Sequence, residues 1–138
     1  MNEYRFDEIE VGMEVSFEYQ LNQDKMRKFL EITEDNNPLH TNLEYAKENG
    51  FPENVVYGQL TAAALSTLAG VYMPGKYSFI HSIETKFLKP VLLSQCPLKV
   101  VGKVIEKEER FQYITLKFEI FNMKNEKVCK GKMEIGVL

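Results

Sequence analysis

Two side chains that can exchange protons lie five residues apart in the segment DNNPLH, which runs from Asp35 to His40. A carboxylate and an imidazole around one water molecule form a competent general acid–base pair, because the first can accept a proton while the second orients the water. Pro38 biases Asn37 towards an extended conformation, so the chain should turn here and let both side chains converge. The same residue types are also typical of an ordinary turn.

A run without any charged residue follows the motif, from Gly58 to Met73. A helix that lacks a polar face is usually buried on all sides. Gly58 should begin this helix, where the first N–H groups have no partner within the helix and could polarise a carbonyl oxygen. Glycine also allows a ligand to approach the backbone closely. The run could therefore supply a third part of the site, an anion-stabilising N–H.

Apolar spacing predicts the elements that must position these residues. Residues 13–20 alternate as a strand, and helical spacing follows from the expected N-cap Asn22 to about Glu34. A second short helix should lie between Asn42 and Gly50. After the charge-free run the period changes to two, which predicts four antiparallel strands near 77–88, 97–107, 110–122 and 127–137.

This element order and the composition indicate one α+β domain over residues 1–138, with a central helix wrapped by a curved antiparallel sheet. A net charge of −3 gives no electrostatic case for nucleic acid. The two cysteines lack the spacing of a disulfide framework or zinc site, which fits a reducing cytoplasm. The polar N-terminus does not look like a signal peptide, and the apolar run is too short and mixed to span a membrane.

Three segments together resemble one known family. TEDNNPLH, residues 33–40, resembles the D-x-N-P-[LIV]-H signature of MaoC-like (R)-specific enoyl-CoA hydratases and dehydratases. FDEIEVGMEV and FLKPV resemble the N-terminal lead and a strand-end segment of the same family. The resemblance implies a hot-dog fold, which is a long central helix wrapped by an antiparallel sheet, and a homodimer or higher homo-oligomer. It implies no cofactor and no metal.

The family's roles transfer by position. The resemblance implies that Asp35 and His40 are catalytic and that Gly58, Asn37 and Ser66 are substrate-binding. Asn37 would help to hold the loop, the Gly58 N–H would contact a thioester carbonyl, and Ser66 would lie near the aspartate. The implied reaction is addition of water to a trans-2-enoyl thioester of coenzyme A or acyl carrier protein, giving an (R)-3-hydroxyacyl thioester, or the reverse dehydration.

The chain departs from the family pattern beside Gly58. Tyr57 and Gln59 stand where the family commonly has histidine and methionine. Two other functions therefore remain open: a hot-dog acyl-CoA thioesterase and a non-catalytic module that binds acyl thioesters. Many hot-dog thioesterases carry their acid on the central helix, whereas the charge-free run here has none, although Asp35 could still activate water for hydrolysis. Ser66 could equally be a packing serine.

Three other polar positions have simpler interpretations. His81 should be a partly buried histidine on a strand face. Lys86 and Lys89 flank a strand end, where they could meet phosphates of coenzyme A or could simply be solvated. The lysines at 124, 127, 130 and 132 should lie on an exposed sheet face.

Overall fold

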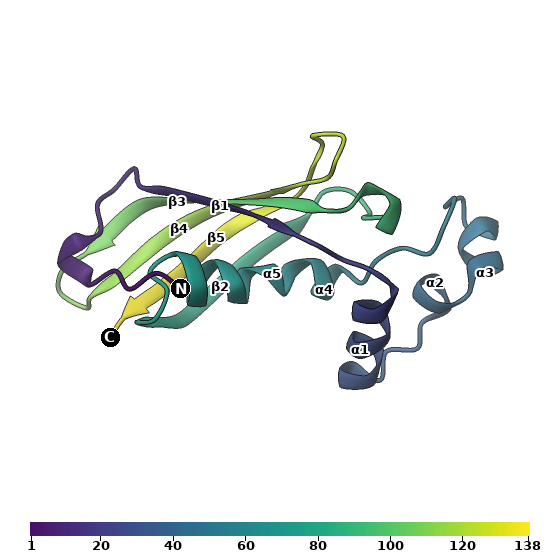
Figure 1. Ribbon diagram of the computed structural model, residues 1–138, viewed down its shortest axis with the longest axis horizontal. Helices are drawn as coiled ribbons and strands as arrows, with labels where there is room; N and C mark the ends of the chain where they lie inside the picture. Colours follow the sequence, from purple (N-terminus) through teal and green to yellow (C-terminus); the bar gives the residue numbers. More distant parts are fainter.

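A single five-stranded antiparallel sheet forms one layer of the computed structural model, which describes all 138 residues (Figure 1). The strand order is β1-β3-β4-β5-β2, so that β1 and β2 are the two edges. The strands are β1 (Glu14–Tyr19), β2 (Ser78–Phe87), β3 (Leu98–Glu108), β4 (Tyr113–Phe121) and β5 (Lys127–Val137). The predicted strands are thereby confirmed: both ends of β5 are as predicted, and the ends of the other strands differ by one to three residues.

The central helix runs across one face of this sheet (Figure 1). It consists of α4 (Gly58–Ala62), α5 (Ala64–Thr67) and a π-helical stretch, Leu68–Tyr72. The helix is therefore present where the charge-free run predicted it, but its hydrogen-bonding pattern changes along its length. Its apolar side packs on the sheet, where Leu65 and Leu68 are almost completely buried.

The period of two in the strands explains how the sheet buries one face. On β4 the side chains of Ile114, Leu116, Phe118 and Ile120 are all fully buried, whereas Lys117 between them is exposed. Burial of each such side chain contributes about 1.5–3 kcal/mol to the free energy of folding.

Two short 3-10 helices lie between the other elements, Phe6–Glu8 before β1 and Leu93–Gln95 before β3.

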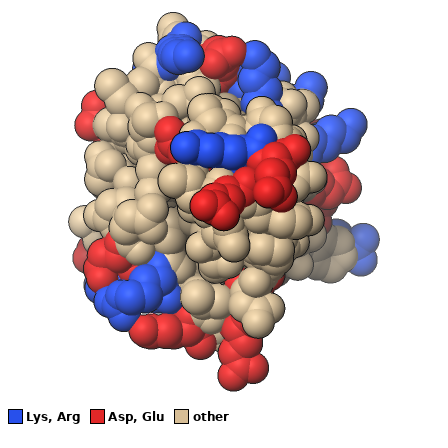
Figure 2. Space-filling view, turned by 90° about the vertical axis from the view of Figure 1, so that its right-hand side faces the viewer, with Lys and Arg blue, Asp and Glu red and all other residues tan.

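Three short helices gather at one end of the molecule, away from both termini (Figure 1). They are α1 (Gln23–Thr33), α2 (Pro38–Thr41) and α3 (Leu43–Glu48). The side chains of Asn22 and Asn42 cap α1 and α3 by accepting the backbone N–H groups of Lys25 and Tyr45, as predicted. Figure 2 shows this end of the molecule, where acidic and basic side chains are interspersed.

Two sequence-based expectations about exposure are wrong. The central helix is not buried all round, because Gln59, Ala63 and Ser66 form an exposed side of it. His81 is exposed, because β2 is an edge strand of which almost every residue on both faces is exposed. The model contains no helix with the length and apolar character needed to cross a membrane.

Candidate active site

The loop between α1 and α2 is shaped by its own short polar side chains. Glu34 ends α1 with a left-handed backbone, φ 59°. Asp35 Oδ1 then accepts the backbone N–H of Asn37 at 3.1 Å, and Asn37 Oδ1 accepts that of Leu39 at 3.0 Å. Asn37 thereby caps α2, and Pro38 occupies the first helical position, where its missing N–H costs nothing. The asparagine side chain holds the loop.

His40 lies in the last turn of α2, and its ring orientation is fixed on both sides. Its Nδ1 lies 2.6 Å from the carbonyl oxygen of Val55. A carbonyl oxygen only accepts, so Nδ1 carries the hydrogen and Nε2 of the neutral ring is left as an acceptor. The ring also stacks on Tyr57, with centroids 4.1 Å apart. The imidazole is therefore oriented to accept a proton through Nε2.

A cavity of about 260 Å³ brings His40 together with the start of the central helix. Gly58 and Thr61 line it from α4, and Phe87 and Lys89 line it from the end of β2 and the segment beyond. Gly58 is the first residue of α4, and its backbone N–H makes no hydrogen bond within the chain. A methyl group on Gly58 would lie 3.3 Å from the Phe87 ring, so only glycine leaves this N–H fully open.

Tyr57 links His40 to Asp35. Its hydroxyl donates to the backbone oxygen of Asp35 at 2.9 Å, while its ring packs between His40 and Phe29. Burial raises the pKa of Tyr57, and the nearby Asp35 carboxylate raises it further. The neutral phenol is therefore the form that holds the Asp35 backbone beside the imidazole.

The structure brings only some of the sequence-predicted residues to one cavity. His40 and Gly58 share it, whereas Asp35 is exposed and is not among the residues that line it. Ser66 lies on a separate groove of about 470 Å³ between the central helix and β2, together with Gln59. Phe87 lines both the groove and the His40 cavity, so the two adjoin at that ring.

Two residues of the site were missed or undervalued in the sequence. Thr61 lines the His40 cavity, is 1% exposed, and its hydroxyl has no hydrogen-bond partner. The only feature of the sequence that could have indicated Thr61 is its hydroxyl, which lies one helical turn after Gly58 in an apolar run. Tyr57 was noticed as a departure from the family pattern, but its contacts with Asp35 and His40 could not be inferred from the sequence.

Comparison with known proteins identifies the family. Residues 7–121 match the model of the MaoC like domain. An (R)-specific enoyl-CoA hydratase from Rhodospirillum rubrum is 27% identical over 106 residues, which are 75% of this chain and 74% of that protein. A mitochondrial 3-hydroxyacyl-[acyl-carrier-protein] dehydratase from Arabidopsis thaliana is 28% identical, over 72% of this chain and 58% of that protein.

Solved structures of hydratases are similar to this chain over most of its length. The (R)-hydratase from A. caviae involved in PHA biosynthesis superimposes with a TM-score of 0.87 at 25% identity, covering 94% of this chain and 98% of that one. R-hydratase PhaJ1 from Pseudomonas aeruginosa gives a TM-score of 0.88 at 26% identity, covering 96% and 84%. These neighbours confirm the expected hot-dog fold. The chain belongs to the MaoC-like domain family.

Proposed function

We propose that this protein is a hydro-lyase that adds water across the double bond of a trans-2-enoyl thioester and gives an (R)-3-hydroxyacyl thioester, or catalyses the reverse dehydration. The observation that carries the proposal is the cavity in which His40, with Nε2 as its free acceptor, lies with the unpaired N–H of Gly58. Hydratases and dehydratases among the relatives support this reaction class.

His40 Nε2 accepts a hydrogen bond from the attacking water and removes its proton as the oxygen bonds to C3. The electrons of the C2–C3 double bond move towards the thioester carbonyl, whose oxygen gains negative charge. The Gly58 N–H stabilises that oxygen, because a preorganised donor acts most strongly where charge develops. The proton that His40 removed, passed on directly or through Asp35, then bonds to C2, which completes the addition and restores the neutral imidazole. The reverse sequence removes water.

Asp35 is the second proton-transfer group of the proposal. Its Oδ1 accepts the Asn37 N–H, whereas Oδ2 has no partner within the chain. Tyr57 stacks on the His40 ring and its hydroxyl holds the Asp35 backbone, so one side chain connects the two residues; the proposal requires the Asp35 side chain to turn towards the water. The role of Asp35 rests on the family motif and on this link through Tyr57.

The test is the loss of enoyl absorbance when purified protein is added to crotonyl-CoA and, separately, to the same acyl group on acyl carrier protein. The variants His40→Ala and Asp35→Asn should each lose on the order of 10²–10⁴-fold in rate. The matched control is His81→Ala, which removes the other histidine of the chain and should keep the rate. An active His40→Ala enzyme would refute the mechanism.

The same reactions separate the two alternatives. A thioesterase would release free thiol, which a thiol reagent detects, and would do so without consuming the double bond. A binding module would bind the acyl thioester without turnover of either kind. We expect hydration without thiol release, because the central helix offers no acid to a hydrolytic water.

We also propose that two copies associate through the β2 edge. Ile80, Ile83 and Phe87 on this strand are 36%, 44% and 51% exposed and line one groove, an unusual row of apolar side chains for a free surface. A second β2 strand would pair with the open edge and cover that row. Sedimentation should give a dimer or a larger assembly, and a monomer would contradict this.

We further propose that the protein acts in the reducing cytoplasm, because both of its cysteines are free thiols.

A further inference from the structure

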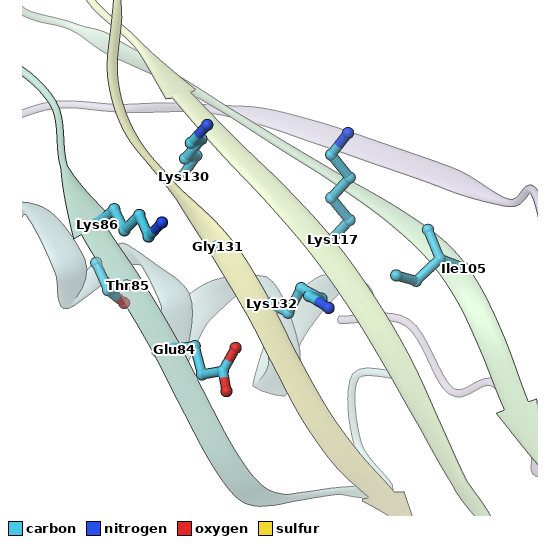
Figure 3. A pocket seen from close by; sticks show the side chains of 8 residues that line it. All are labelled: Glu84, Thr85, Lys86, Ile105, Lys117, Lys130, Gly131 and Lys132. Atoms are coloured by element: carbon cyan, nitrogen blue, oxygen red, sulfur yellow. The ribbon is translucent and has the colours of Figure 1, made fainter.

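A hollow of about 620 Å³ lies on the face of the sheet opposite the central helix, and the proposed reaction makes no use of it (Figure 3). Lys117 enters it from β4, Lys130 and Lys132 from β5, and Lys86 from β2. We call this set the lysine hollow. Ile105 of β3 is the one hydrophobic side chain that lines it, and Gly131 contributes backbone from β5 (Figure 3).

Several lysines of the hollow are opposed to other lysines in the sheet. Lys117 is directly opposite both Lys132 and Lys103 in the strand register, and Lys86 is directly opposite Lys130. Like charges in such cross-strand positions destabilise a sheet. None of the four lysines of the hollow forms an ion pair within 4 Å. The free protein therefore holds four ammonium groups in this hollow with one carboxylate, that of Glu84, among them, although the net charge of the chain is −3.

One acid, Glu84, lines the hollow itself and lies opposite Lys132 in the strand register. The other nearby acids are either occupied or outside the basic area. Glu119 is opposite Lys130 in register but pairs with Lys127 at 2.5 Å. On the other side the surface becomes acidic, because Glu84, Glu106 and Glu134 line an adjoining smaller hollow. An extended acidic protein surface or a nucleic-acid backbone laid across the sheet would meet these carboxylates. A compact anion confined to the hollow would meet only one of them, Glu84.

We propose that the lysine hollow binds a nucleotide, a nucleoside carrying at least two phosphate groups. Its volume lies within the range of small-molecule sites, roughly 300–1,000 Å³. Lysine ammonium groups suit phosphate oxygens as point charges. Ile105 and the methylene stems of the lysines give an apolar surface on which a base can lie. Inorganic phosphate would leave that surface exposed to water, so the nucleoside contributes to binding.

The experiment is a fluorescence titration of the whole protein with a mant-labelled ADP at low salt. The variant Lys117→Gln/Lys132→Gln removes two adjacent ammonium groups and should raise Kd on the order of 100-fold, from the loss of two charge-assisted contacts. The control Lys47→Gln/Lys124→Gln makes the same change in net charge at exposed lysines outside the hollow and should bind like the wild type. Equal weakening in both variants would overturn the proposal, as would no binding by the wild type.

Competitors define the ligand class. Unlabelled ADP should displace the probe, and pyrophosphate should do so at higher concentration. Displacement by a glutamate decapeptide as effective as that by ADP would overturn the nucleotide in favour of an acidic protein segment. Coenzyme A distinguishes the two sources of nucleotide. If it competes and the lysine variant raises KM for crotonyl-CoA, the hollow holds the substrate's own nucleotide. If it does not compete and KM is unchanged, the ligand is a separate nucleotide.

Folding of the lysine variant provides an independent check. Because Lys117 and Lys132 face each other, their replacement should leave Tm unchanged or raise it. ADP should raise the Tm of the wild type and of the control but not that of the lysine variant. An equal rise in all three proteins would place the ligand elsewhere and overturn the assignment.

Discussion

Replacement of Tyr57 by phenylalanine removes one hydroxyl and leaves the aromatic ring in place. That hydroxyl donates to the backbone oxygen of Asp35 at 2.9 Å. The ring still stacks on His40, whose Nδ1 contact with Val55 is untouched. The variant therefore frees the Asp35 end of the loop without disturbing the imidazole, so it isolates the positioning of Asp35.

The expected cost in stability is small. A neutral hydrogen bond contributes about 0.5–1.5 kcal/mol net. Asp35 is exposed, so water replaces the lost donor, and the lower half of that range applies. For a chain of this size the loss corresponds to roughly 2–5 °C in Tm. The expected loss in kcat/KM is about tenfold or more, because small displacements of reacting groups are costly in rate.

Tyr19→Phe is the matched control. Its hydroxyl also donates to a backbone oxygen at 2.9 Å, that of Leu60, but it does not touch the Asp35 loop. Thermal unfolding and the crotonyl-CoA assay should show similar losses in Tm for both variants, with a loss of rate for Tyr57→Phe alone. Tyr57→Leu, which also removes the stack on His40, should be slower still. If Tyr57→Phe keeps the wild-type rate while its Tm falls like that of the control, Tyr57 is only a structural residue and the reasoning fails.

Three other predictions concern stability. Thr61→Val should raise the free energy of unfolding by about 1 kcal/mol in a urea titration, because the buried hydroxyl has no partner and valine keeps its shape. Gly131→Ala should abolish folding or cost about 3 kcal/mol or more, because its Cβ would lie 1.8 Å from the Glu84 carbonyl oxygen. Burial raises the pKa of Cys129 to about 11, so the unfolded chain loses this proton first and stability should fall between about pH 9 and 11. Iodoacetamide at pH 8 should label Cys129 only after unfolding.

The fold followed from the sequence because local signals agreed with one another. Asn22 and Asn42 are the caps of their helices, and the period of two located every strand to within a few residues. The burial of the central helix was misjudged, because the absence of charge does not distinguish a buried side from one that a second chain could cover. The exposure of His81 was misjudged because it lies on an edge strand, and the alternation of residue types does not show which strand is at an edge.

Apart from Gly58, the sequence predicted only those site residues whose side chains can themselves take part in proton transfer. Asp35 and His40 stood out by type and spacing, whereas Asn37 and Ser66 were named only through the family resemblance. Asn37 does hold the loop, but the groove of Ser66 is separate from the His40 cavity. Whether Asp35 and His40 act on one water remains a prediction for the kinetic assay.

No residue type in the sequence indicates the contact that orients His40. Val55 accepts the imidazole Nδ1–H through its carbonyl oxygen, while its own N–H donates to the carbonyl of Leu39 at 3.2 Å. The next residue, Val56, donates to the Val91 carbonyl at 2.8 Å, which ties the same segment to the chain beyond β2. All three bonds use backbone groups at residue 55 or 56, so any residue except proline could make them there. The tautomer of His40 is thus fixed by a backbone carbonyl, that of Val55, which other backbone hydrogen bonds hold in place. Mutation of the Val55 side chain should therefore change the rate much less than mutation of Tyr57.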